Sequence, residues 1–369
     1  MPAEPHSVRR IVLGALALAC AYVALLALAA GLVSGRGGLA ASLSSLGPGI
    51  LLAVAALQLT ALGLQTARWR LLLGGTDPVR LPFVQAFGIQ LAAHTCNVVL
   101  PFLGGDLAAS WVLQRRWGVP WARSLAASLY ARVAGLLTCA ALALPTAALL
   151  LGQGLPASIA AGLGRAGALV LAVAGALVLL SLFPRPLVWI GSRCGRWAQA
   201  RGRAPWRGRL GQGLMLLGWW LHTTATRDRA QVAGSIALSA LNYAVQTVSI
   251  LVLAQGLGLT PHPIAGLALI TVSALGGLTT FALPGGGLAE ELVMYSLARA
   301  LLQAPVAGAA ALVVGFGTLR VALMALGVPL VPWYLRSTPP TELAPLWRAD
   351  PAGILDLLGA SAALGAPRA

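Results

Sequence analysis

The sequence has no lysine and few charged side chains of any kind. Only 9% of its 369 residues are charged, whereas 58% are hydrophobic. Soluble proteins average about 25% charged and about 45–50% apolar residues. This composition excludes an ordinary soluble protein, and apolar runs of about 20 residues or more predict an all-α, polytopic helical membrane protein.

Acidic residues are scarcer than basic ones. Nine acidic residues stand against 25 arginines, which gives a net charge of +16 and a pI near 11.5. A basic pI alone would suggest nucleic-acid binding. Here the arginines lie between the apolar runs, where they mark membrane topology and attract anionic lipid head groups. We therefore expect membrane lipids, and not nucleic acid, as partners.

Clustered cysteine and histidine residues are also missing. The four cysteines and four histidines are scattered along the chain, and no C-x-x-C motif is present. These spacings indicate neither a disulfide framework nor a zinc site. We expect no bound metal ion, no cofactor and no catalytic residue.

Long apolar segments are abundant, and six of them are long enough to cross a bilayer: 11–33, 49–67, 122–151, 165–183, 230–256 and 305–335. The last contains Pro329 and Pro332, so it is expected to end early or kink. Arg9 and Arg10 before the first segment resemble a signal peptide, but the following run can span, and we favour an uncleaved helix. Two further apolar regions, 82–116 and 263–303, are broken near their middle by Pro and Gly.

The distribution of the arginines predicts the orientation of the chain in the membrane. If each broken region returns to the side that it enters from, 20 of the 25 arginines lie in the cytoplasm, nine of them in a basic loop at 185–229. If 82–116 crossed fully, that loop would lie outside, against the positive-inside rule. We therefore predict six full spans and two re-entrant hairpins in a bacterial cytoplasmic (inner) membrane, with both termini cytoplasmic. Residues 1–336 would form one transmembrane domain and residues 337–369 a mobile cytoplasmic tail.

The two broken regions share one pattern. The first reads LPFLGGD up to Asp106 and the second LPGGGLAE up to Glu290. Each is followed by an apolar arm, a proline and a helix with one arginine, which is Arg132 in the first unit and Arg320 in the second. The units cover about 82–140 and 263–328. Because they enter from opposite sides, they predict a pseudo-symmetric inverted repeat, an arrangement frequent in secondary transporters.

The breaks consist of prolines and glycines, namely Pro101, Gly104, Gly105, Pro284, Gly285, Gly286 and Gly287. Broken backbone at membrane depth is tolerated only inside protein or against a water-filled cavity. A membrane-embedded arginine is costly unless it is paired. Asp106 with Arg132, and Glu290 with Arg320, are the expected pairs, within a unit or exchanged between units. A purely structural role in helix packing is the alternative, but the symmetric recurrence favours substrate binding.

Further residues are weaker candidates. Asn97 lies one turn before Pro101 and is expected either to cap the broken backbone or to serve packing. Arg68 and Arg70 either bind lipid phosphate or mark topology. Glu291 is the weaker acid beside Glu290, and His94 is expected to be buried and satisfied.

These motifs resemble a family of flippase-like integral membrane proteins that share the transmembrane region of lysylphosphatidylglycerol synthetases. The resemblance covers about residues 10–335, and its elements are Trp69-Arg70, NVVLPFLGGD from Asn97, SLYARVAGLL around Arg132, LPGGGLAEELV from Leu283 and GTLRVAL around Arg320. It implies a protein that moves or handles lipids, with lipid-biosynthesis enzymes as candidate partners.

The chain departs from the family pattern in two ways. A basic residue often follows the first acid, whereas this chain has Leu107-Ala108-Ala109-Ser110, which leaves the head-group preference open. Only 34 residues follow Leu335. We therefore expect no soluble aminoacyl-transferase domain, which excludes a lysyl-lipid synthase.

The resulting hypothesis is a lipid flippase, and not an enzyme, that moves an amphipathic lipid with an anionic or glycosylated head group between leaflets. Arg132 and Arg320 would attract the head group, and Asp106 and Glu290 would be their resting partners or couple protons. One alternative is a membrane-embedded lipid or glycosyl transferase with one of these acids as base. Another is a non-catalytic scaffold of a lipid pathway. No pattern in the sequence specifies an oligomeric state.

Overall fold

Each segment predicted to span the membrane contains a long helix. The computed structural model describes residues 5–74, 81–99, 104–152, 157–183, 185–186, 188–193, 215, 218, 222, 229–276 and 286–329. Regular structure in these ranges is helical, without strands. The helices are α1 (Pro5–Ser34), α2 (Arg36–Ser44), α3 (Pro48–Gly74), α4 (Phe83–Val99), α5 (Gly104–Trp117), α6 (Trp121–Gly152), α7 (Ala157–Leu182), α10 (Arg229–Gly256), α11 (Pro263–Gly276), α12 (Gly286–Leu301) and α13 (Val306–Ala325).

Four helices in the described part of the chain, α3, α6, α10 and α13, are long and apolar enough to cross a membrane by themselves. The second half of α1 meets this criterion only together with α2, from which it is bent by 112°. Gly35 lies between them with a φ of 73°, a conformation that glycine adopts at little cost. The apolar part of α7, Gly167–Leu180, is shorter than a span. The protein is thus a multi-pass helical membrane protein.

The predicted end of the second span is wrong. The sequence predicts an end at residue 67, but α3 continues to Gly74 and includes Arg68 and Arg70. The guanidinium of Arg123 donates to the carbonyls of Leu73 (3.2 Å) and Gly74 (2.8 Å), which satisfies the C-terminal end of the extended helix.

The last span also differs from its predicted limits. The apolar pattern extends to residue 335, whereas α13 ends at Ala325 and is followed by turns up to Pro329. An early end is the expected effect of Pro329, because proline cannot donate to the helix and disfavours helical backbone in the residue before it.

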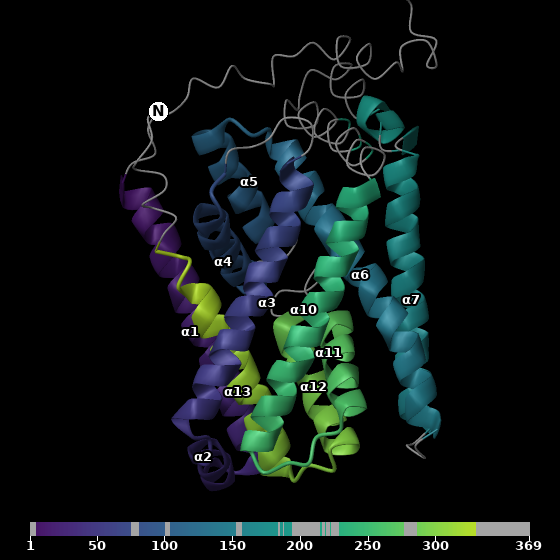
Figure 1. Ribbon diagram of the computed structural model, residues 1–369. Coiled ribbons are helices and arrows are strands. Elements are labelled where there is room, and N and C mark those ends of the chain that lie inside the picture. The colour runs from purple at the N-terminus through teal and green to yellow at the C-terminus, as the bar shows by residue number, and fades with distance from the viewer. Residues whose placement is uncertain are drawn as a thin grey trace, which may run out of the picture.

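The two broken regions form pairs of short helices. In the first pair α4 packs against α5, and in the second α11 packs against α12. The pairs occupy opposite ends of the bundle: α4 and α5 lie in its upper half in Figure 1, and α11 and α12 in its lower half. The glycines at 104, 105, 286 and 287 begin α5 and α12. Pro101, Pro284 and Gly285 lie outside the described residues, as do most of the 185–229 loop and the whole 337–369 tail.

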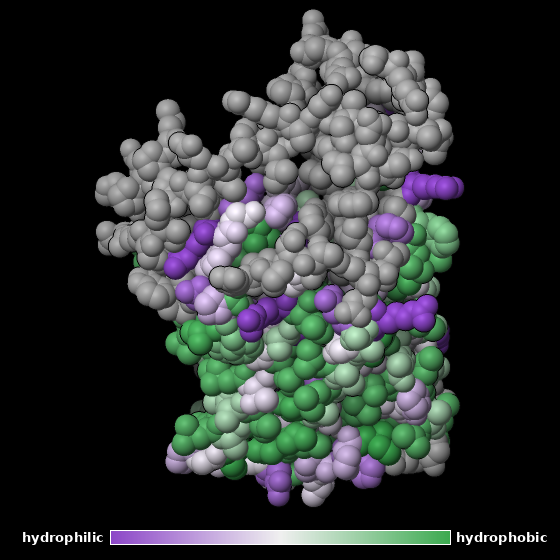
Figure 2. Space-filling model, turned by 45° about the horizontal axis from the view of Figure 1, so that its top comes forward, coloured by the Kyte–Doolittle hydropathy of each residue, from purple (hydrophilic) through white to green (hydrophobic). Residues whose placement is uncertain are grey.

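Long helices pack against these hairpins. A large buried cluster joins α1, α6 and α10 to α11, α12 and α13, and a second cluster lies among α3, α4, α5 and α6. Small residues from Gly308 to Ala311 are all buried in α13, which lets neighbouring helices approach closely. Apolar side chains form a continuous band on the visible side of the molecule, with hydrophilic residues above and below it (Figure 2). A band of this extent fits a lipid-facing surface.

Candidate substrate cavity

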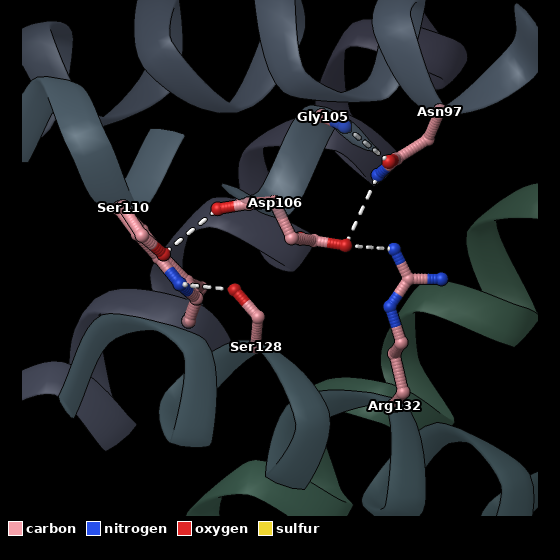
Figure 3. A network of polar contacts seen from close by, with 7 residues as sticks. Asn97, Gly105, Asp106, Ser110, Ser128 and Arg132 are labelled. Carbon is pink, nitrogen blue, oxygen red and sulfur yellow. Dashed lines mark hydrogen bonds and ion pairs between the residues drawn. The ribbon is translucent and has the colours of Figure 1, made fainter. Parts of the chain in front are cut away.

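The first polar cluster joins the α4–α5 hairpin to α6. Asp106 lies in the first turn of α5, where the helix dipole favours a negative charge. Its Oδ2 accepts hydrogen bonds from the guanidinium of Arg132, with which it forms an ion pair, and from Asn97 Nδ2 at 3.2 Å. Figure 3 shows both side chains converging on the Asp106 carboxylate. Asp106 is only 5% exposed, so these contacts satisfy a charge that is nearly removed from solvent.

Asn97 also fixes the start of α5. Its Oδ1 accepts a hydrogen bond of 2.8 Å from the backbone N–H of Gly105 (Figure 3), a group that has no partner inside its own helix. Gly105 lies so close to α4 that a Cβ there would overlap the carbonyl oxygen of Ala93. A residue without Cβ is therefore required where α5 begins. The close approach of α5 to α4 places Asp106 next to Arg132.

A second polar cluster, which joins the α11–α12 hairpin to α13, has the same arrangement. Glu290 of α12 accepts a hydrogen bond of 3.0 Å from Arg320 Nη1 of α13, and the same Oε1 accepts the hydroxyl of Ser273 from α11. Each cluster thus combines a polar side chain from the first hairpin helix, an acid from the second and an arginine from the next long helix. The pairs form within each unit and are not exchanged between units.

Both clusters line one partly open cavity of about 250 Å³. Its charged lining residues are Arg68, Asp106, Arg132, Glu290, Glu291 and Arg320, and its other polar lining residues are Tyr22, Gln65, Gln90, His94, Asn97, Ser128, Asn242, Tyr243, Gln246 and Ser273. The side chains of Arg132 and Arg320 are 27% and 31% exposed. Each arginine is therefore held by an acid and still has a partly exposed side chain.

The described acidic residues are concentrated at this cavity. Asp106, Glu290 and Glu291 are the only acids within the described ranges, and all three belong to its lining. They are 5%, 8% and 5% exposed. Because buried carboxylates in an apolar bundle are costly, their convergence distinguishes the cavity from the rest of the bundle.

Of the two candidate head-group arginines, Arg68 and Arg70, only the first lines the cavity. Arg68 projects inward rather than marking a helix end: its Nη1 donates to Ser239 Oγ at 2.7 Å and lies beside Gly135. Arg70, two residues further along, is exposed and does not line the cavity. Sequence reasoning missed other lining residues, such as Gln90 and Asn242, although a polar residue inside an apolar helix was an available signal.

Two residues given little weight from the sequence belong to the site. Glu291 lines the cavity, and its Oε2 has no hydrogen-bond partner among the described residues. His94 lines it as well, and its Nε2 likewise lacks a partner in the described part of the chain, so the expectation of a satisfied histidine is wrong for this atom. Within the same ranges, no three His, Cys, Asp or Glu side chains are placed to hold a metal ion.

Comparison with known proteins identifies one family. The family model described as lysylphosphatidylglycerol synthase TM region matches residues 11–327. This range includes every lining residue of the cavity, from Tyr22 to Met324. No curated protein and no solved structure matches the chain.

Proposed function

The chain belongs to the family of the lysylphosphatidylglycerol synthase transmembrane region, and on this basis we propose that it moves an amphipathic lipid, with an anionic or glycosylated head group, between the two leaflets of its membrane. The activity makes and breaks no covalent bond, so the protein acts as a transporter and not as an enzyme. The observation that carries the proposal is the convergence of both arginine–acid pairs on one partly open cavity.

The size of the cavity limits what enters it. Sites that enclose drug-sized molecules measure about 300–1,000 Å³, and this cavity of about 250 Å³ lies just below that range. It accommodates a polar head group but not two acyl chains. The chains would remain among the lipids, where they lose no hydrophobic stabilisation, while the head group crosses inside the protein.

The paired arginines supply the attraction for the head group. A polar group in a bilayer core loses its water and requires new hydrogen bonds. Arg132 and Arg320 offer these bonds when their guanidinium groups turn from Asp106 and Glu290 toward the substrate. Asp106 and Glu290 would neutralise the two arginines while the cavity is empty. They would pair with the arginines again after the head group is released.

We further propose a topology that gives both leaflets access. In this arrangement α4–α5 and α11–α12 are re-entrant hairpins of an inverted repeat, and six spans surround them. The opposite placement of the two hairpins in the bundle (Figure 1) supports this arrangement. The excess of arginine in the predicted cytoplasmic segments supports cytoplasmic termini in a bacterial inner membrane. Rocking of one unit against the other would expose the cavity to each side in turn.

Proteoliposomes that contain a fluorescent phospholipid test the proposed function. Externally added dithionite bleaches the probe in the outer leaflet only, so transport appears as bleaching of the inner-leaflet probe as well. We expect such bleaching with the wild-type protein and not with protein-free liposomes. The Arg132→Gln, Arg320→Gln double variant should lose it, because the arginines that attract the head group are gone.

The control variant is Arg299→Gln, which removes an exposed arginine of α12 outside the cavity. It should transport at the wild-type rate. A double variant that folds, as judged by gel filtration and thermal unfolding in detergent, and still transports as fast as the wild type would contradict the proposal. A panel of probes with phosphate, amine and sugar head groups avoids dependence on one lipid.

A further inference from the structure

One wall of the cavity carries nitrogen atoms without partners. Arg68 Nε of α3, and Gln90 Nε2 and His94 Nε2 of α4, are buried and have no hydrogen-bond partner among the described residues. All three residues line the cavity. Gln90 and His94 are four residues apart and so project from the same face of α4, which packs against α3. A buried donor without a partner is unfavourable. A ligand that offers a hydrogen-bond acceptor to these groups would therefore be stabilised at this wall.

Arg68 is also a cation without an acidic partner. The ion pairs of the cavity join Arg132 to Asp106 and Arg320 to Glu290, whereas Arg68 forms no ion pair with a described carboxylate. Its guanidinium donates to the neutral hydroxyl of Ser239. A guanidinium in an apolar bundle is stabilised by an opposite charge. The cavity therefore has a positive charge available on its α3 side.

These groups point to a phosphate subsite. We propose that Arg68, Gln90 and His94 bind the phosphoryl oxygens of a phospholipid head group. Guanidinium and amide N–H groups are donors only, and His94 Nε2 donates in one of its two neutral tautomers. A phosphodiester offers several acceptor oxygens and a negative charge, and arginine matches its geometry. Sugar hydroxyls both donate and accept, so a wall of donors fits them less well.

This inference rests on the proposed function and narrows its substrate class. Arg132 and Arg320 already have acids, so Arg68 would make the first contact with the anion. The unpartnered acceptors of the cavity, Asn242 Oδ1 and Glu291 Oε2, come from α10 and α12. They would meet the hydroxyl or amine groups beyond the phosphate.

Calorimetric titration of the purified full-length protein in detergent tests the subsite. The probes are a short-chain phosphatidylglycerol, a short-chain glucosyl diacylglycerol without phosphate, and inorganic phosphate. We expect the wild type to prefer phosphatidylglycerol over both other probes. Arg68→Gln should weaken phosphatidylglycerol binding about 10- to 100-fold, because a hydrogen bond to a charged group is lost. Gln90→Leu should weaken it about 3- to 10-fold.

Controls separate recognition from folding. Arg299→Gln, which removes an exposed arginine outside the cavity, should bind as the wild type does. If Arg68→Gln fails to fold, Gln90→Leu carries the test, since it removes one donor and leaves every charge in place. Wild-type affinity in the folded variants would overturn the subsite, and so would equally tight binding of the glucosyl lipid. Inorganic phosphate that binds as tightly as the phospholipid would assign the site to free phosphate instead.

Failure of the phosphate subsite can be distinguished from failure of the proposed transport function. A protein that transports only glycosylated probes would remain a flippase, but its substrate would not be a phospholipid. A protein that binds phosphatidylglycerol through Arg68 and transports no probe would keep the subsite and lose the transport proposal.

Discussion

Replacing Asp106 by alanine is expected to destabilise the protein by about 3–5 kcal/mol, because it leaves Arg132 as a cation without its acid in a largely buried cluster. Asp106 is 5% exposed, and its carboxylate binds both Arg132 and Asn97. The reverse change, Arg132→Ala, leaves the Asp106 carboxylate without its cation and should lower stability by a similar amount. Thermal unfolding in detergent, followed by circular dichroism, measures both effects.

A double-mutant cycle of Asp106→Asn, Arg132→Gln and the two changes combined separates the pair from its surroundings. In the Asp106→Asn, Arg132→Gln double variant neither charge remains, and the amides can still form hydrogen bonds. It should recover most of the lost stability, since the penalty comes from one unpaired charge and not from the absence of the pair. Arg299→Ala removes an exposed arginine and should change stability by less than about 0.5 kcal/mol. Additive effects of the two single changes would show that the pair is uncoupled.

Gly105→Ala is expected to lower stability by about 1–3 kcal/mol through overpacking and to reduce lipid transport as well. The new Cβ would overlap the carbonyl oxygen of Ala93 and lie 2.8 Å from Asn97 Oδ1. Helix α5 would have to move away from α4, and Asp106 would move with it. Helix propensity alone predicts the opposite sign, because alanine stabilises a helix interior by about 1 kcal/mol relative to glycine.

Gly162→Ala in α7 is the matched control. A Cβ at this position meets nothing within 4 Å, so only the propensity gain remains and stability should rise slightly. Thermal unfolding of the two variants side by side measures the difference in sign. If Gly105→Ala were as stable as the wild type, the tight contact between α4 and α5 would not be required.

Several features of the site were predictable because they depend on local sequence. An arginine inside an apolar run needs a partner, and acids are so rare that Asp106 and Glu290 were the available choices for Arg132 and Arg320. The proline–glycine breaks predicted two short helices in place of one long one, and α4–α5 and α11–α12 have that form. The position of Asn97 one turn before the break made it a candidate cap, with a packing role as the alternative.

Other features depended on contacts between distant segments. The end of α3 was placed too early because Arg68 and Arg70 look like the polar end of a span, whereas Arg123, 49 residues from Gly74, satisfies the carbonyls of a longer helix. The spacing of 26 residues between Asp106 and Arg132 permitted a pair but did not exclude exchange with the other unit. The spacing of apolar residues along α3 did not indicate which face of this helix is turned toward the cavity.

The sequence by itself determined the class of protein, the positions of the breaks and the identity of the charged residues that must be compensated, because the cost of polar groups in an apolar medium is a local property. Only the tertiary structure decided that two clusters, formed far apart in the chain, share one cavity, and that Arg68 faces it while Arg70 does not. Such choices follow from how α3, α4, α6 and α13 pack against one another. That Arg68 forms no ion pair with a described carboxylate becomes meaningful only when the residues around it in the cavity are known.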